Sequence, residues 1–165
     1  MATNLDPHTN FSRACRAIVD LNTDILRDEL DSHVTPSDIA SKANACTKLP
    51  SLRPEQWIVI NNAATKGSYE DFDSSLLYIM IRNLCSLPPP KLGWNKKPLG
   101  TDLSVAADVE RIRYYRNEVY GHTTRAEISD SEFRIIWLDL EKISERFDKN
   151  RPGKNYKKAK RLKDE

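Results

Sequence analysis

The sequence predicts an all-α protein, a bundle of five or six helices. Only five of the 165 residues are glycine, 30% are charged, and runs of β-branched residues are few, which argues against a sheet protein. Apolar residues instead recur three or four positions apart along several segments, as they do in amphipathic helices. A chain of this length is expected to form one domain with a sizeable core.

Six helical segments can be placed from these patterns and from helix-capping residues. They are a first helix from about Asn10 to Asp31, a short second helix that opens at Thr35-Pro36 and ends before Pro50, a third from Pro54 to Gly67, a fourth over Ser74–Leu84, a fifth that starts at Asp102 or Ser104, and a last one behind a capping box at Ser129–Glu132. The fourth segment is apolar on nearly every side, so we expect it at the centre of the bundle. Prolines at 88–90 predict a long loop over residues 86–103.

Charge divides the chain into two parts. Residues 151–165 carry seven Lys/Arg against two acids, so residues 1–150 hold 19 basic and 22 acidic residues. We therefore predict a helical domain over 1–150, followed by a basic linker or disordered tail over 151–165. The helical domain is not a generic basic nucleic-acid binder, and any contact with nucleic acid must be local.

Cysteine usage indicates the compartment. Cys15, Cys46 and Cys85 are odd in number, widely spaced and free of any Cys-x-x-Cys pattern, which favours reduced thiols over disulfides or a metal site. No signal peptide is indicated, and no stretch has the roughly 20 apolar residues of a membrane span. We expect a cytoplasmic or nuclear protein that needs no metal or other cofactor.

The helix expected before Gly121 carries an arginine within its apolar stripe. Arg116 falls on the face formed by Val105, Val109, Ile112 and Val119. A guanidinium directed toward a core is costly unless a carboxylate or another anion meets it. Asn117 follows directly, and His122 lies six residues beyond Arg116.

Arg116 and His122 would point about 120° apart on an unbroken helix, because six residues rotate by roughly 600°. A left-handed Gly121 just past the helix end would let the chain fold back and bring His122 toward Arg116. Alternatively, the pair meets its counterpart across the two-fold axis of a dimer.

Arg-Asn-x-x-x-x-His resembles the motif of the HEPN superfamily, a set of helical-bundle domains that includes many metal-independent ribonucleases. Within this superfamily, the sequence most resembles one eukaryotic subfamily, that of the HEPN domain of the DAZ-interacting zinc-finger ubiquitin ligase. It covers about residues 11–148 and is carried by four segments: Asp71–Leu77, Leu77–Leu87, Pro88-Pro-Pro with Gly93-Trp94, and Asp108–His122.

The resemblance implies an endoribonuclease that needs no metal, works as a homodimer and acts on single-stranded RNA, with a role in antiviral or stress defence. Arg116 would stabilise the charge that builds on the phosphate. His122 would act as general acid or base, because its ordinary pKa of about 6.5 suits proton transfer near neutral pH. Asn117 would orient the phosphate or the imidazole.

Two further RNA contacts are predicted from residue types. Lys91, Trp94, Lys96 and Lys97 combine cations with an aromatic ring in the long loop, and Tyr120 could stack on a base. The structural alternative for Trp94 is that it caps the bundle, and we favour that interpretation.

Two hypotheses about function follow. The first is the ribonuclease. The second is a noncatalytic RNA-binding or dimerisation module of a larger multidomain protein, in which Arg116 pairs with a buried acid and His122 helps to close the helix. No zinc-finger or ubiquitin-ligase catalytic segment is recognisable in the sequence, so ligase activity is not predicted.

Overall fold

The computed structural model describes residues 6–121 and 124–150, and within these ranges the fold is helical without any strand. The prediction of an all-α bundle is confirmed. The helices are α1 (Pro7–Arg16), the π-helical η1 (Ala17–Asn22), α2 (Thr23–His33), α3 (Ile39–Ala45), α4 (Pro54–Lys66), α5 (Ser74–Leu84), α6 (Val105–Tyr120) and α7 (Asp130–Asn150). None of the described helices is both long and apolar enough to cross a membrane.

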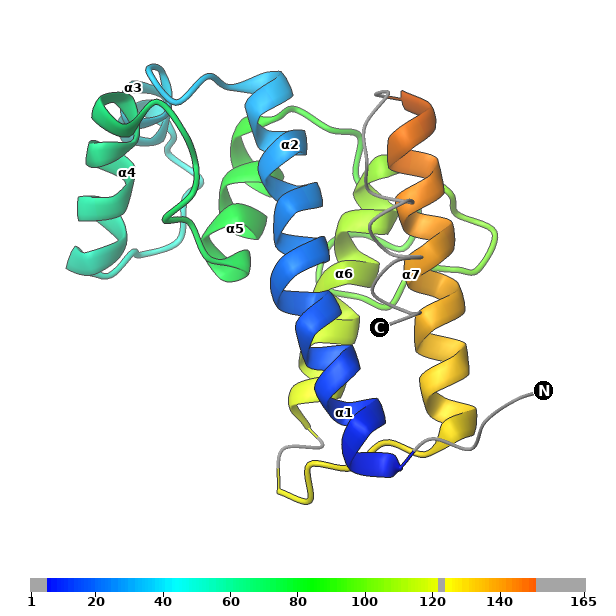
Figure 1. Ribbon diagram of the computed structural model, residues 1–165. Coiled ribbons are helices and arrows are strands. Elements are labelled where there is room, and N and C mark those ends of the chain that lie inside the picture. The colour runs from blue at the N-terminus through cyan, green and yellow to red at the C-terminus, as the bar shows by residue number, and fades with distance from the viewer. Residues whose placement is uncertain (1–5, 122–123, 151–165) are drawn as a thin grey trace.

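The first predicted helix is one long rod made of α1, η1 and α2 (Figure 1). Its buried stripe follows the predicted spacing and includes Ala14, Ile18, Leu21 and Ile25. The π turn in the middle of the rod was not predicted, because a widened turn leaves the apolar spacing nearly unchanged. Such turns in α-helices occur often at functional sites.

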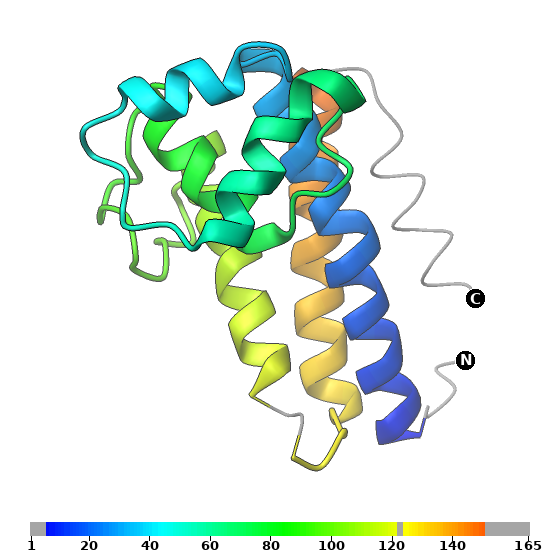
Figure 2. The same cartoon turned by 90° about the vertical axis from the view of Figure 1, so that its left-hand side faces the viewer.

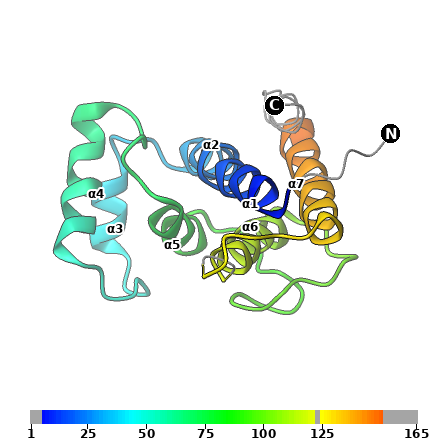
Figure 3. The ribbon, with the colours of Figure 1, turned by 60° about the horizontal axis from the view of Figure 1, so that its bottom comes forward.

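The rod packs against the two long helices α6 and α7, and α5 lies along its α2 part (Figures 1 and 2). The short helices α3 and α4 pack on each other beside α5, away from α7 (Figure 3). Helix α5 occupies the predicted residues Ser74–Leu84, and Leu77, Met80 and Ile81 on it are fully buried. The central position that its apolar sequence predicted is therefore confirmed.

A buried carboxylate on α6 joins several elements. Asp108 is 1% exposed and accepts hydrogen bonds from Arg146 Nε (2.8 Å) and Nη2 (2.7 Å) on α7 and from Arg111 Nη1 (2.7 Å) on its own helix. The hydrogen bonds to Asp108 raise the pKa of Arg146 above its ordinary value. Arg111 also donates to the carbonyls of Leu99 and Asp102, so the same network holds the loop before α6.

Some predicted helix ends are confirmed and others are wrong. The first helix begins at Pro7, before the predicted Asn10, and α3 begins at Ile39, after the predicted Thr35-Pro36. The predicted end of α4 and the predicted starts of α5 and α6 are confirmed. Ser104 caps α6 through the amide of Ala107, Asp73 caps α5, and Gly67 ends α4 in the left-handed conformation. Gly121, in contrast, has right-handed values of φ −63° and ψ −20°, and its amide donates to the carbonyls of Asn117 and Glu118. The helical turn therefore continues into Gly121, and the proposed reversal at a left-handed glycine does not occur.

We predict that Asp108→Asn destabilises the fold strongly, by about 3–5 kcal/mol, because it leaves two partly buried guanidiniums without their counter-charge. Urea denaturation at neutral pH measures this as a shift of the unfolding midpoint. Asp71→Asn is the matched control, since Asp71 pairs with Lys66 at the surface, where solvent screens the interaction. Equal midpoints for the two variants would contradict the central role of Asp108.

Candidate functional site

Arg116 occupies the predicted face of α6. Val109, Ile112 and Val119 are fully buried on this face, whereas Arg116 is half-buried and reaches the surface of the bundle. The following residue, Asn117, is exposed, and Tyr120 one turn further is 40% exposed. The helix thus presents its motif at the border between the core and solvent.

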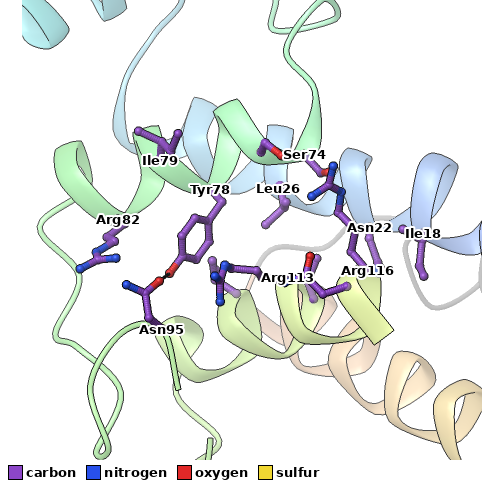
Figure 4. Close-up of a pocket in the computed structure, with 14 residues that line it drawn as sticks. Ile18, Asn22, Leu26, Ser74, Tyr78, Ile79, Arg82, Asn95, Arg113 and Arg116 are labelled. Carbon is purple, nitrogen blue, oxygen red and sulfur yellow. Dashed lines mark hydrogen bonds between the residues drawn. The ribbon is translucent and has the colours of Figure 1, made fainter. Parts of the chain in front are cut away.

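A cavity of about 390 Å³ opens beside Arg116, between α5 and α6, and the η1–α2 part of the rod forms its third side (Figure 4). We call it the arginine cavity, because Arg82 from α5 and Arg113 and Arg116 from α6 line it. None of its lining residues is an aspartate or a glutamate. The remaining lining residues are Ile18, Asn22, Leu26, Ser74, Ser75, Tyr78, Ile79, Asn95, Val109, Ile112 and Asn117.

No acid within residues 6–121 and 124–150 pairs with Arg116, although the structural alternative requires a buried one. Its Nε is buried, and no described residue hydrogen-bonds to it. The guanidinium instead lies over the ring of Tyr120, with Cζ 5.0 Å from the ring centroid. Arg116 also borders a second cavity of about 420 Å³ on the side of Tyr120. Asp71 and Asp73 line this second cavity, whereas no acid lines the arginine cavity, so the arginine cavity is the favourable side for an anion to approach this guanidinium.

Arg113 is held more firmly than Arg116. Its Nη1 lies 3.6 Å from Glu110 Oε2, and its Cζ lies 5.2 Å from the centroid of the Tyr78 ring. Glu110 is 1% exposed and accepts hydrogen bonds from the Tyr78 hydroxyl and from the backbone N–H of Asn95 (2.8 Å). The pKa of Tyr78 is raised to about 12, mainly by burial and secondly by this hydrogen bond to Glu110.

Opposite charges three residues apart, Asp108 with Arg111 and Glu110 with Arg113, predict ion pairs along a solvated face of this helix. Both ion pairs form on α6. The expectation that these pairs form a solvated face is wrong, because both carboxylates are almost completely buried. The alternation of charges on α6 resembles that of a surface helix, and nothing in it indicates that the long loop and α7 cover the acids.

The long loop places its aromatic residue against the bundle. Trp94 is half-buried, stands edge-on to Tyr78 with ring centroids 6.1 Å apart, and carries Arg82 over its ring at 5.8 Å. Lys91, Lys96 and Lys97 are exposed, and Lys97 Nζ lies 4.8 Å from the centroid of Tyr114. The loop thus presents cations to solvent while its tryptophan packs inward.

His122 lies outside the described residues, so its approach to Arg116 remains a prediction. The cavity instead brings Arg116 together with Asn117, Arg82, Arg113 and Asn22, of which only Asn117 was proposed as a site residue. Asn22 carried a signal in the sequence, since a polar residue four positions after Ile18 lies within an apolar stripe. Among the described residues, no group of three or more His, Cys, Asp or Glu is arranged to hold a metal ion.

Comparison with known proteins identifies relatives of this bundle. The family described as DZIP3/hRUL138-like HEPN matches residues 36–164. Over 74 residues, 45% of the chain, the sequence is 34% identical to the E3 ubiquitin-protein ligase DZIP3 of Homo sapiens and 32% identical to that of Mus musculus. Each match spans 6% of the relative's length. No solved structure matches the chain significantly.

The raised pKa of Tyr78 predicts a pH dependence of stability. The folded chain holds the phenol proton up to about pH 12, whereas the unfolded chain releases it near the ordinary value of 10.0. The stabilisation is therefore complete below about pH 10 and is lost as pH rises toward 12. We expect the stability difference between the wild type and Tyr78→Phe, measured by urea denaturation from pH 9 to 12, to narrow across this window. A constant difference would contradict the assignment.

Proposed function

The chain belongs to the DZIP3/hRUL138-like HEPN family, and from this premise we propose that it binds single-stranded RNA beside Arg116 and cleaves it without a metal ion. Arg116 stabilises the phosphate, and His122 transfers protons. The observation that carries the proposal is a buried guanidinium nitrogen at the mouth of two cavities with no hydrogen-bond partner among the described residues. A phosphate oxygen would satisfy this donor and neutralise its charge.

The chemistry requires Arg116 and two imidazoles, one neutral and one protonated. Neutral His122 takes the proton of the ribose 2′-hydroxyl, and the 2′-oxygen attacks the adjacent phosphorus. The bond from phosphorus to the 5′-oxygen breaks, and the leaving oxygen receives a proton from a protonated imidazole. The products are a 2′,3′-cyclic phosphate and a free 5′-hydroxyl. Arg116 donates to the phosphate oxygens while negative charge accumulates on them.

One histidine cannot serve as base and acid in the same step, so we propose that two chains form a homodimer and each supplies one imidazole. The exposed motif end of α6, with Asn117 and Tyr120 at the surface, is compatible with a facing copy. In this arrangement Asn117 orients the phosphate that Arg116 holds.

The second candidate function is noncatalytic: the domain would serve as an RNA-binding or dimerisation module. The contact between Arg116 and the Tyr120 ring favours it, because this contact gives the guanidinium a structural partner without any ligand. The matched relatives are named as ubiquitin ligases and are far longer than the matched segment, so such a module would bring RNA or a second copy to other domains.

We predict that the purified protein cleaves labelled single-stranded RNA in EDTA and that Arg116→Ala lowers the rate by about 10²–10³-fold, the effect of removing one donor to a transition-state oxyanion. His122→Ala should lower it by about 10²–10⁴-fold. Analysis of the product ends should show 2′,3′-cyclic phosphates. Arg134→Ala, which removes an exposed arginine on α7, is the control and should keep full activity.

Two outcomes separate the alternatives. Intact RNA that is nevertheless bound in an Arg116-dependent manner would overturn the enzyme and favour the module. RNA that is neither bound nor cleaved by a folded protein would contradict both.

A further inference from the structure

The loop between α5 and α6 contains three consecutive prolines, at positions 88–90. The ring of each proline fixes its own φ at about −65° and restricts the residue before it to extended or polyproline II values of ψ. Pro88 and Pro89 are subject to both restrictions, because each is a proline and each precedes one. Residues 87–90 therefore form a short polyproline II helix, which we call the proline segment.

One face of the proline segment packs against the bundle. A polyproline II helix has about three residues per turn, so residues three positions apart lie on the same face. Leu87 and Pro90 share such a face. Pro90 is buried, and Leu87 is half-buried and packs against the core. Pro88 and Pro89 occupy the other two faces, and both are exposed. The segment thus presents a pair of adjacent prolines to solvent.

The chain is fixed on both sides of the proline segment. Ser86, just before it, has a left-handed φ of 52°, which redirects the chain after α5. Beyond it, the amide of Gly93 donates to the carbonyl of Pro90 (2.8 Å), and the amide of Lys91 donates to the buried carboxylate of Asp102 (2.8 Å). A partner would therefore meet a preformed ligand and would order little further chain on binding.

The backbone of the proline segment is open to hydrogen-bond donors. Within residues 6–121 and 124–150, no group donates to the carbonyls of Leu87, Pro88 or Pro89. The connection between α5 and α6 lies on the side of α6 that faces away from the rod (Figures 2 and 3). A domain that covers the two exposed prolines can therefore also donate hydrogen bonds to these carbonyls.

The surroundings of the proline segment are cationic. Residues 86–101 contain three lysines, Lys91, Lys96 and Lys97, and no acid, and all three lysines are exposed. Lys91 follows directly after the segment, and its neighbour Leu92 is 43% exposed. A groove that receives the segment is complementary to this charge if acidic residues lie at its rim.

We propose that the proline segment is a docking site for a partner domain of the WW type, with a groove between two aromatic rings and acidic residues at its rim. Aromatic-lined grooves bind polyproline II segments because these are already ordered before binding. SH3 domains instead read a second proline three positions after the first, and none of the three prolines here has one. The adjacent pair Pro88-Pro89 fits a single groove. The proposal goes beyond the ribonuclease function and does not depend on it.

The test follows the backbone amide signals of the isotope-labelled full chain by NMR while isolated WW domains are added. One set of these domains has acidic groove rims and the other has basic rims. We expect saturable binding of the acidic-rimmed domains, with the largest shifts at Leu87, Lys91 and Leu92. An SH3 domain and a single-stranded RNA are titrated in parallel.

The key variant is Pro88→Ala/Pro89→Ala, which removes both exposed rings and keeps the buried Pro90. We expect it to bind the acidic-rimmed domains more weakly by about tenfold or more, because the paired rings supply the central contact. Pro50→Ala, at an exposed proline before α4, is the matched control and should bind like the wild type. Equal urea midpoints of the double variant and the wild type verify that the fold is kept.

Lys91→Ala gives a second test that leaves all three prolines in place. We expect it to weaken binding of the acidic-rimmed domains, whereas Lys48→Ala, which removes an exposed lysine before α4, should have no effect. Equal affinity of the wild type for acidic and basic rims would overturn the acidic rim.

Three results would overturn the docking site. They are an absence of binding by every WW domain, unchanged binding by a folded Pro88→Ala/Pro89→Ala variant, and binding of the SH3 domain alone. Shifts at Leu87, Lys91 and Leu92 that appear with RNA and with no WW domain would assign the loop to nucleic acid and contradict the proposal.

Discussion

Two buried carboxylates on α6, Asp108 and Glu110, support the structure around the candidate site. Asp108 fixes α7 to α6 through Arg146, and Glu110 holds the Tyr78 ring and the loop at Asn95. Buried carboxylates are stable only when donors satisfy them, and here each is met by at least one arginine and by further hydrogen bonds or a second arginine. With these acids occupied, no described acid pairs with Arg116, about two turns further along the helix.

The arginines of α6 differ in how completely acids pair with them, and this difference explains where positive charge collects. The guanidinium of Arg111 is paired with Asp108 and hydrogen-bonded to loop carbonyls, and Glu110 partly neutralises the charge of Arg113. Among the described residues, Arg116 lies over an aromatic ring and pairs with no carboxylate, and Asn22, which lines the same cavity, is buried without a hydrogen-bond partner. Asn10 Oδ1 and Trp137 Nε1 are also buried without a partner among the described residues. Arg116 differs from them because its unpaired donor is cationic and because the residue lines two cavities, as expected where function, and not stability, determines the residue.

Local signals in the sequence determined much of the fold correctly. The limits of α5 follow from residues adjacent in the chain, as does the long loop after it, whereas the sequence left Asp71 and Asp73 open as the cap and the structure shows Asp73 in that role. The site was less predictable, because it depends on distant contacts. Covering Glu110 requires Tyr78 and the loop at Asn95, 32 and 15 residues away. The widened turn at Asn22 was missed for a related reason, since its effect on the apolar spacing is small.

The central claim is that Arg116 is a phosphate ligand, and NMR of its side chain tests this most directly. The Nε–H signal of Arg116, assigned by comparison with Arg116→Lys, can be followed while single-stranded RNA is added, with Arg134 as an exposed reference. We expect the Arg116 signal to shift and its exchange with water to slow as RNA saturates the protein, while the Arg134 signal stays in place. An Arg116 signal that does not move at saturating RNA, while backbone signals elsewhere do, would contradict the claim.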